Sequence, residues 1–257
     1  MNSNSALADT FVRYFQLAFP DAADSDALRE AYRIRYQVFC EELGFFKATA
    51  SPEEEVERDE FDQRSSHCVV RHRLTGYPAG YVRLVHCGLD TATRLLPIEM
   101  RFHDCLVHPI LHPEHLDRNK ICEISRLSVH AGFRRRAGEK EWLHGDPVWL
   151  QGGPDHLRTF PLITVALFMG VLGMAIAQGR EHAFAMMEPR LSRLVKASGF
   201  AVTKVGEPRE YYGLRTTYHI DLLHALDLAR TSPLLNPLYR AAWKGMTGGS
   251  GLQRVAE

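Results

Sequence analysis

The feature that most constrains the fold is a run without any charged side chain over residues 159–178. It is about as long as a membrane-spanning helix. Thr159 can cap a helix and Pro161 suits a first helical turn, while Gly170 and Gly173 would let another backbone approach closely. The flanks carry no basic cluster. We therefore expect a buried core helix, with a membrane span as the alternative.

Composition narrows the class of protein further. The chain has 257 residues, of which 45% are apolar, so it can form a substantial core. Its 31 basic and 31 acidic residues balance, which gives no reason to expect a nucleic-acid partner. The five cysteines form no close pair, and the first basic residue, Arg13, follows Asp9 without a long apolar run. We expect a cytoplasmic protein with reduced thiols and at most peripheral membrane contact.

Hydrophobic periodicity and turn residues predict a mixed α/β sheet with helices on both faces. The expected helices cover residues 10–19, 24–43, 159–178 and 189–198, and the expected strands cover 68–73, 80–85, 121–129, 182–187, 200–205 and 216–222. Strands 68–73 and 80–85 are predicted to form a hairpin. Residues 223–257 are expected to form a helical tail that is partly flexible.

Charged residues interrupt three segments that otherwise have the pattern of core. Arg35 lies on an apolar helix stripe, Asp59 and Asp62 follow an acidic loop, and Glu123 and Arg126 lie in the strongest strand. Charges among apolar residues cost free energy unless they meet partners. The three segments therefore suggest one shared polar site, although ion pairs that only tie a helix to a loop would give the same pattern.

Several longer stretches carry a resemblance to a known family. They are Arg33-Ile-Arg-Tyr-Gln-Val-Phe-Cys-Glu-Glu42, Glu57-Arg-Asp-Glu-Phe-Asp62, Arg83-Leu, Glu123-Ile-Ser-Arg-Leu-Ser-Val129, Met186-Met-Glu-Pro-Arg-Leu191 and Gly206-Glu-Pro-Arg-Glu-Tyr-Tyr-Gly213. The chain resembles the acyltransferases associated with the PEP-CTERM/exosortase system, relatives of long-chain N-acyl amino acid synthases and of acyl-homoserine-lactone autoinducer synthases. Phe45 stands where the autoinducer synthases usually carry tryptophan, which favours the N-acyl amino acid branch.

The resemblance implies a GNAT-like N-acyltransferase domain over residues 1–222. It implies transfer of a medium or long fatty acyl group from acyl carrier protein to the α-amine of an amino acid or similar small amine. The donor would be acyl-phosphopantetheine or acyl-CoA, with no tightly bound cofactor. No cysteine nucleophile is obvious, so we expect direct attack. The alternatives are an acyl-CoA-dependent enzyme acting on a polyamine or protein lysine, and a non-catalytic module that senses acyl carrier protein or lipid.

Within this family, Glu123 and Arg126 are the central candidates. Three residues apart on a regular strand they would face opposite sides, so a β-bulge is needed to bring both into one cleft. Glu123 could accept the ammonium proton, directly or through a water, and Arg126 could hold a substrate carboxylate or orient Glu123. Arg35, Asp59 and Asp62 are expected to form one network at the mouth of the acceptor site.

The remaining candidates follow from the same matched stretches. Those expected to bind substrate are Phe39, Phe45, Arg83, Ser125, Leu127, Val129, Met187 and Glu188. The basic tract Arg134, Arg135 and Arg136 would suit an acidic carrier protein, although a solvated loop explains it equally well. His103, His108, His112, His115 and Cys105 lie close together in the sequence but match no zinc spacing, so no metal site is expected.

Overall fold

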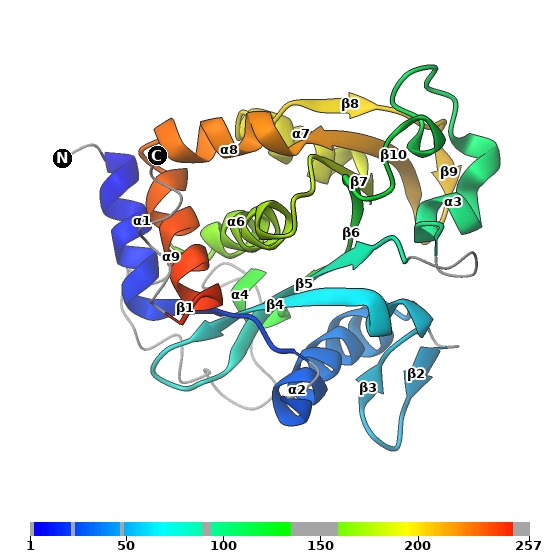
Figure 1. Ribbon diagram of the computed structural model, residues 1–257. Helices are drawn as coiled ribbons and strands as arrows, with labels where there is room; N and C mark the ends of the chain where they lie inside the picture. The colour runs from blue at the N-terminus through cyan, green and yellow to red at the C-terminus, as the bar shows by residue number, and fades with distance from the viewer. Residues whose placement is uncertain (1–2, 22–23, 47–48, 89–93, 135–158, 249–257) are drawn as a thin grey trace.

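The computed structural model describes residues 3–21, 24–46, 49–88, 94–134 and 159–248. A mixed sheet runs through the molecule in the order β1-β4-β5-β6-β7-β10-β8, and β9 pairs with the end of β10 (Figure 1). Its strands are β1 (Phe15–Ala18), β4 (Ser65–His72), β5 (Pro78–His86), β6 (Ile121–Val129), β7 (His182–Met187), β8 (Val202–Lys204), β9 (Arg209–Glu210) and β10 (Leu214–Asp221). Strands β6 and β7 are parallel, and the other pairs are antiparallel. The predicted mixed α/β fold is confirmed.

Helices cover the two faces of this sheet. On one face lie α1 (Ser3–Tyr14), α6 (Leu162–Ala177), α8 (Leu222–Thr231) and α9 (Leu235–Met246), and on the other lies α2 (Ser25–Arg35) (Figure 1). Strand β4 shows the division, because Cys68 and Val70 join the large core under α6 while Val69 joins the core under α2. Successive strand residues point to opposite faces. Both faces are therefore apolar, as the predicted arrangement requires.

The shorter elements lie mostly at one end of the sheet. They are β2 (Ala50–Ser51), β3 (Val56–Glu57), the 3-10 turns η3 (Glu60–Arg64), η4 (His103–Cys105) and η5 (Pro113–His115), and the helices α3 (Pro97–Phe102), α4 (Ala131–Arg134) and α7 (Pro189–Ala197). Helix α2 begins at the Asp24 cap and continues into the π-helical turn η1 (Tyr36–Glu42), and the turn after it ends at Gly44, whose φ is 69°. The expected stop at Gly44 is confirmed, because glycine adopts positive φ at little cost.

The prediction of a helix over residues 10–19 is wrong in its second half. Helix α1 ends at Tyr14, and Phe15 to Ala18 pair with β4 as its edge neighbour. Phe15 and Leu17 are buried while Gln16 is exposed, which is the alternation of a strand. Pairing with β4 gives these residues ladder hydrogen bonds that a further helical turn would not supply.

Helix α6 is the buried core helix that the uncharged run predicts, and no helix among the described residues is long and apolar enough to cross a membrane. Thr159 is not its cap; the cap position is Pro161, which offers no side-chain bond. A Cβ on Gly170 would collide with Sγ of Cys68, and Gly173 lies next to Met246. These glycines allow close packing on β4 and α9.

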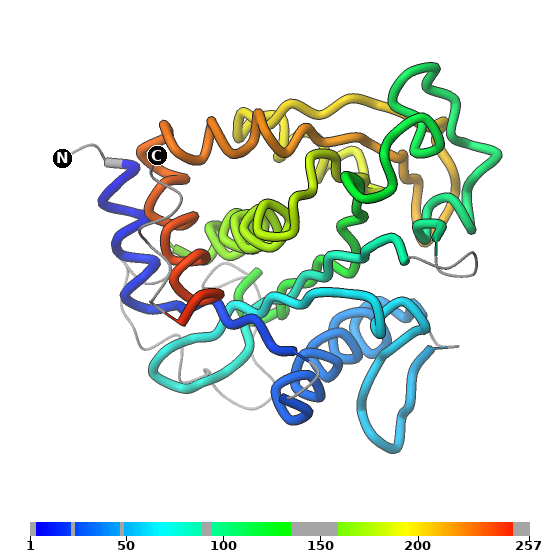
Figure 2. The backbone as a smooth tube through the Cα atoms, viewed as in Figure 1, coloured from blue at the N-terminus to red at the C-terminus, as the bar shows by residue number. Residues whose placement is uncertain are grey.

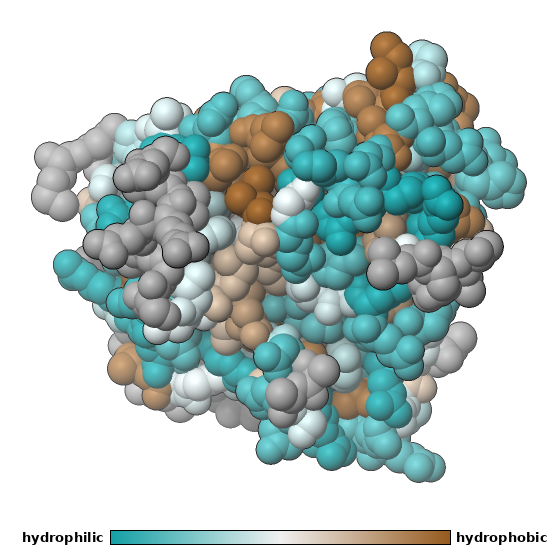
Figure 3. Space-filling model, viewed as in Figure 1, coloured by the Kyte–Doolittle hydropathy of each residue, from teal (hydrophilic) through white to brown (hydrophobic). Residues whose placement is uncertain are grey.

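The two C-terminal helices share the core of the sheet. Leu238 and Ala242 of α9 are fully buried in the same apolar cluster as α6, and α9 lies beside α1 (Figure 2). On the face shown in Figure 3 the surface is largely hydrophilic, with apolar patches such as the loop where Val107 and Ile110 are 57% and 70% exposed. The division at residue 222 stays a prediction, and residues 249–257 of the predicted tail lie outside the described part.

Candidate active site

A cleft lies where β6 and β7 stop pairing. The two strands are paired only from Ile121 and His182 to Glu123 and Phe184. Beyond that point, residues of both strands line a cleft of about 120 Å³ together with α3, the turn after α2 and one side chain of α6. The lining residues are Phe39, Phe46, Arg83, Pro97, Ile98, Arg101, Phe102, Glu123, Ile124, Ser125, Arg126, Leu127, Phe168, Ala185, Met186, Met187, Leu191, Tyr211 and Arg215.

The β-bulge predicted in β6 is confirmed. Tyr81 of β5 lies opposite Ser128 and Arg83 lies opposite Ser125, so β6 contains one extra residue between these pairs. Arg126 occupies that position with a φ of 57°, in the left-handed region that non-glycine residues seldom adopt. The extra residue cancels the alternation of the strand. Glu123 and Arg126 consequently line the same cleft, as their proposed roles require.

Glu123 is a buried carboxyl group that forms no ion pair with any described cationic side chain. Its side chain accepts a hydrogen bond from the backbone N–H of Ile98 at 2.8 Å, and the residue is 5% exposed. Burial raises the pKa of Glu123 to about 7, although the Ile98 hydrogen bond and the charges of Arg83 and Arg101 oppose the rise. A carboxyl group that titrates near neutral pH can take up and release a proton at the operating pH of a cell. This is the electrostatic condition for a general base.

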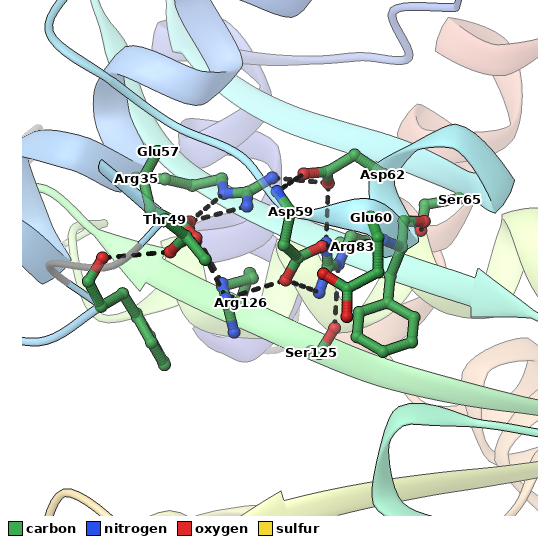
Figure 4. A network of polar contacts seen from close by, with 12 residues as sticks. Arg35, Thr49, Glu57, Asp59, Glu60, Asp62, Ser65, Arg83, Ser125 and Arg126 are labelled. Carbon is green, nitrogen blue, oxygen red and sulfur yellow. Dashed lines mark hydrogen bonds and ion pairs between the residues drawn. The ribbon is translucent and has the colours of Figure 1, made fainter. Parts of the chain in front are cut away.

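Arg35, Arg83 and Arg126 alternate with Glu57, Asp59 and Asp62 in a closed ring of ion pairs, which we call the charge ring (Figure 4). The shortest N–O distances are 2.6 Å for Arg35–Glu57, 2.6 Å for Arg35–Asp62, 2.7 Å for Arg83–Asp62, 2.5 Å for Arg83–Asp59, 2.9 Å for Arg126–Asp59 and 3.0 Å for Arg126–Glu57. Each arginine contacts two carboxylates and each carboxylate contacts two arginines. The ring is neutral overall, and no side chain in it is more than 7% exposed.

Local structure explains the spacing of the two aspartates. Asp59 caps the 3-10 turn η3 by accepting from the N–H of Phe61, and Asp62 accepts from the N–H of Asp59 at 2.8 Å. This reciprocal capping box fixes both carboxylates on one side of the turn. Burial alone would raise their pKa values, but the neighbouring arginines outweigh it and hold the pKa of Asp59 and of Asp62 below the ordinary range.

The predicted network therefore exists, with two differences. Arg35 contacts Asp62 but not Asp59; its second partner is Glu57, which the sequence analysis did not single out. Arg83, predicted to bind substrate, has its guanidinium occupied by Asp59, Asp62 and the hydroxyl of Ser125 at 3.0 Å. The signal for Glu57 was present, because it opens the matched stretch that ends at Asp62 and lies in a buried two-residue strand.

Arg126 joins the charge ring to the cleft. Its guanidinium lies 3.8 Å from the ring centroid of Phe46, which covers it on one side. The guanidinium of Arg126 donates its described hydrogen bonds to Glu57 and Asp59, which balance its charge. No hydrogen bond joins it to Glu123 in the described structure. Phe46 lines the cleft, whereas Phe45 stacks on Tyr212 with ring centroids 4.6 Å apart and does not.

The other predicted substrate residues divide between the cleft and its surroundings. Phe39, Ser125, Leu127 and Met187 line the cleft. Val129 lies further along β6 in the main core. Glu188 pairs with the cleft residue Arg215 at 2.8 Å, so it contacts the site indirectly.

The predicted carrier-binding tract is described only at its first residue. Arg134 donates to the carbonyl of Val129 at 2.7 Å and pairs with Glu42. Arg135 and Arg136 lie outside the described residues. Among the described residues, no group of histidine, cysteine or acidic side chains could hold a metal ion, and no cysteine lines the cleft.

A larger hollow of about 1200 Å³ opens on the α2 side of the sheet, where Tyr32, Asp62 and His67 are among its lining residues. Burial lowers the pKa of His67 to about 4, and the pKa of Asp62 is lowered as well. The pKa of Asp59, which also lines this hollow, is lowered too. The smaller cleft, with Glu123, is therefore the better candidate for proton transfer.

Comparison with known proteins identifies the central part of the chain. Residues 34–143 match the family model described as an acetyltransferase (GNAT) domain. This stretch is therefore similar to GNAT domains. The match supports the predicted GNAT-like fold. A search of curated proteins found no match.

Several solved structures are similar to this chain over most of its length. The structure of TofI in complex with an inhibitor and MTA matches with a TM-score of 0.60 and 18% identity, over 86% of this chain and 99% of that chain. The CoA-dependent acyl-homoserine lactone synthase BjaI, with SAM and isopentyl-CoA, matches with a TM-score of 0.55 and 18% identity, over 88% of this chain and 98% of that chain. FeeM, an N-acyl amino acid synthase from uncultured soil microbes, matches at 12% identity over 86% of this chain and 97% of that chain. Its TM-score of 0.47 is too low to support a structural inference. These likenesses show the fold.

Proposed function

We propose that the chain is an N-acyltransferase that moves a medium or long fatty acyl group from acyl carrier protein to the α-amine of an amino acid or similar small amine. The observation that carries the proposal is Glu123, a buried carboxyl group with a pKa of about 7 in a cleft between two strands that have stopped pairing. A structural carboxylate in this position would be expected to have a cation beside it, as every carboxylate of the charge ring has.

Transfer of an acyl group to an amine requires a residue that removes a proton from the amine. An α-amine is mostly protonated at neutral pH and attacks only after losing a proton. Glu123 accepts that proton, directly or through a water, before the nitrogen attacks the thioester carbonyl. The C–N bond forms, and the C–S bond breaks as the tetrahedral intermediate collapses. The nitrogen gives up a second proton, and the departing sulfur gains one and leaves as a thiol. No acyl-enzyme is formed, which agrees with the lack of a cysteine among the described lining residues.

The acyl chain would extend along the apolar part of the cleft. Phe168, Met186, Met187 and Leu191 form that part, and the volume of about 120 Å³ is below the ~300–1,000 Å³ of most ligand pockets. A medium or long chain must therefore widen the cleft. Methionine side chains adapt easily to such changes because they are unbranched and flexible. Each methylene that becomes buried would contribute ~0.8 kcal/mol.

The choice of carrier protein over CoA rests on the resemblance and on the basic tract 134–136. BjaI is a CoA-dependent enzyme, so both donors need to be tested. We expect a higher kcat/KM for the same acyl group on carrier protein than on CoA. Arg135→Glu should weaken use of the carrier thioester, with a loss that shrinks at high salt, and should leave the CoA thioester unaffected. Equal or better use of acyl-CoA by the wild type would contradict this choice.

The reaction itself is tested without knowing the amine. Organic extracts of cells that overproduce the chain should contain an N-acyl amino acid by mass spectrometry, and this product should be missing when Glu123→Gln is overproduced. Acylated polyamine or protein lysine would favour the alternative acceptors. The absence of any acylated product, with either donor in vitro, would favour a binding module. A link to the PEP-CTERM/exosortase system is part of the proposal on the resemblance alone, and a cytoplasmic location is part of it because the cysteines form no close pair in the sequence.

A further inference from the structure

Four arginines line the cleft, and they differ in how far their charges are already balanced. Arg83 and Arg126 each contact two buried carboxylates at 3.0 Å or less. Arg215 pairs with Glu188 at 2.8 Å. Arg101 has one described carboxylate nearby, Glu60, at 3.7 Å. Since charge attraction falls with distance and with exposure, Arg101 has the least compensated charge of the four.

The remaining contacts of Arg101 hold it in place without neutralising it. Its guanidinium lies 5.1 Å from the ring centroid of Phe61, and Nη1 donates to the hydroxyl of Tyr211 at 3.4 Å. The side chain is 33% exposed, and that of Glu60 is 65% exposed. An ion pair of this length between exposed groups is worth little. The guanidinium is thus available to an anion that enters the cleft.

Helix α3 fixes Arg101 beside the base. The backbone N–H of Ile98 donates to Glu123, and Arg101 follows three residues later on the same side of the helix. The helix is itself anchored, because Glu99 accepts from the N–H of Leu96 at 2.8 Å and pairs with Arg118 at 2.6 Å. The geometry of α3 therefore links the position of the Arg101 backbone to that of the Glu123 carboxyl group.

From this arrangement we infer that Arg101 binds the carboxylate of the acyl acceptor and so selects α-amino acids over amines without a carboxylate. The inference rests on the proposed function and adds the residue that sets its acceptor class. A planar guanidinium can hold a carboxylate through two parallel hydrogen bonds. In an α-amino acid the amine and the carboxylate share one carbon atom, so a carboxylate on Arg101 brings the amine toward Glu123.

The electrostatics of the two groups act in the same direction. The Arg101 charge lowers the pKa of Glu123, so a bound carboxylate that offsets this charge raises the affinity of Glu123 for a proton. Binding of the correct acceptor thereby strengthens the base. An amine without a carboxylate leaves the Arg101 charge in place and gains neither effect.

The test compares acids with their carboxamides. We expect the wild type to have a higher kcat/KM for the amino acid that it acylates than for the carboxamide of that amino acid. Arg101→Gln should lower this acid-to-amide ratio by about 10- to 100-fold, the range for a hydrogen-bonded charge. Most of the change should be in the KM of the acid. Arg101→Lys should retain an intermediate ratio.

Glu60→Gln is the matched control, since it removes the only described carboxylate that forms an ion pair with Arg101 and leaves the arginine. It should keep or raise the acid-to-amide ratio. If Arg101 acted only through its pair with Glu60, the two variants would lose the ratio equally, and the inference would be overturned. An unchanged ratio in a folded Arg101→Gln protein would also overturn it.

A binding measurement separates this inference from the proposed function. Calorimetry with N-decanoyl-alanine and N-decanoyl-alaninamide needs no donor or turnover. Tighter binding of the acid by the wild type, lost in Arg101→Gln, supports the inference even in the absence of turnover. Turnover with an equal affinity for acid and amide would instead retain the acyltransferase and reject the role of Arg101.

Discussion

The charge ring and the Glu123 cleft adjoin each other and treat buried charge in opposite ways. In the ring, three arginines and three carboxylates satisfy one another, and the pKa values of Glu57, Asp59 and Asp62 are held low. In the cleft, Glu123 is buried with one backbone hydrogen bond, and its pKa rises to about 7. The ring keeps all six of its side chains charged, whereas the cleft allows Glu123 to gain and lose a proton near neutral pH.

The two regions therefore respond to pH with opposite signs. The carboxylates of the ring have lowered pKa values, so their stabilisation is present above the ordinary pKa and is lost as the pH falls through the lower folded values. Glu123 has a raised pKa, so the folded state is favoured below a pH of about 4.5 and this advantage is lost as the pH rises to about 7. A carboxyl group that weakens the fold at neutral pH is more readily explained by function than by stability.

Breaking the ring at one residue should have the largest effect on the fold. Arg35→Leu leaves Glu57 and Asp62 buried with one cation fewer, and we expect a loss of about 3–5 kcal/mol in the free energy of unfolding. Chemical denaturation measures it. Arg33→Leu, an exposed arginine of the same helix, is the control and should change stability by less than about 0.5 kcal/mol.

Removing a neighbouring pair from the ring should cost less than the two single changes together. In Arg35→Leu with Asp62→Leu, the remaining Glu57, Arg126, Asp59 and Arg83 are still neutral overall and still in contact. We expect a coupling energy above ~1 kcal/mol in the double-mutant cycle. Additive effects would show that the ring does not act as a unit. Full activity in all three variants would make the ring structural only.

Changing the cleft should separate activity from stability. Glu123→Gln keeps the shape and removes the base, so kcat at neutral pH should fall ~10²-fold or more. The same variant should be more stable than the wild type above pH 7, by up to about 3 kcal/mol, because it no longer has to ionise in a buried site. Urea denaturation at pH 5 and pH 8 shows whether the gain appears only at the higher pH. A loss of stability at pH 8 would mean that Glu123 is part of the structural network.

The substitution Arg126→Lys tests whether Arg126 belongs to the charge ring or to the reacting groups of the cleft. Its effects on stability and activity should be the smallest of those predicted here. A lysine keeps the charge but cannot reach Glu57 and Asp59 through three hydrogen bonds, so we expect a loss of about 1 kcal/mol in stability. The fall in kcat should be well below that of Glu123→Gln. An equal fall in kcat would assign Arg126 to the reacting groups, as the sequence first suggested.

The sequence predicted those parts of the fold that depend on local pattern. Strand β6, the hairpin of β4 and β5, and the buried α6 follow from apolar runs and turn residues. Residues 15–18 were missed, because four residues carry too little periodicity to outweigh the helix before them, and only the pairing with β4 decides. Strand β9 was missed for the same reason, because it is only two residues long.

At the site, the sequence indicated which charges must meet but not which pairs form. The six charged residues of the ring come from α2, β3, the capped turn η3, β5 and β6, and only the folded sheet brings these five elements together. Arg101 lies in α3, where the sequence predicted neither a helix nor a strand, and nothing in its sequence neighbourhood distinguishes it from a surface arginine. Its significance appears only once the other cleft arginines are seen to be paired.

The central claim is that Glu123 titrates near neutral pH in the folded protein. The most direct measurement is a carbon-detected NMR titration of the glutamate side-chain carboxyl signals, with Glu123→Gln used to assign the resonance. We predict a midpoint at about pH 7 for this residue. A midpoint at the ordinary glutamate value of about 4.3 would contradict the account, because the carboxylate would then be a weak base at any physiological pH.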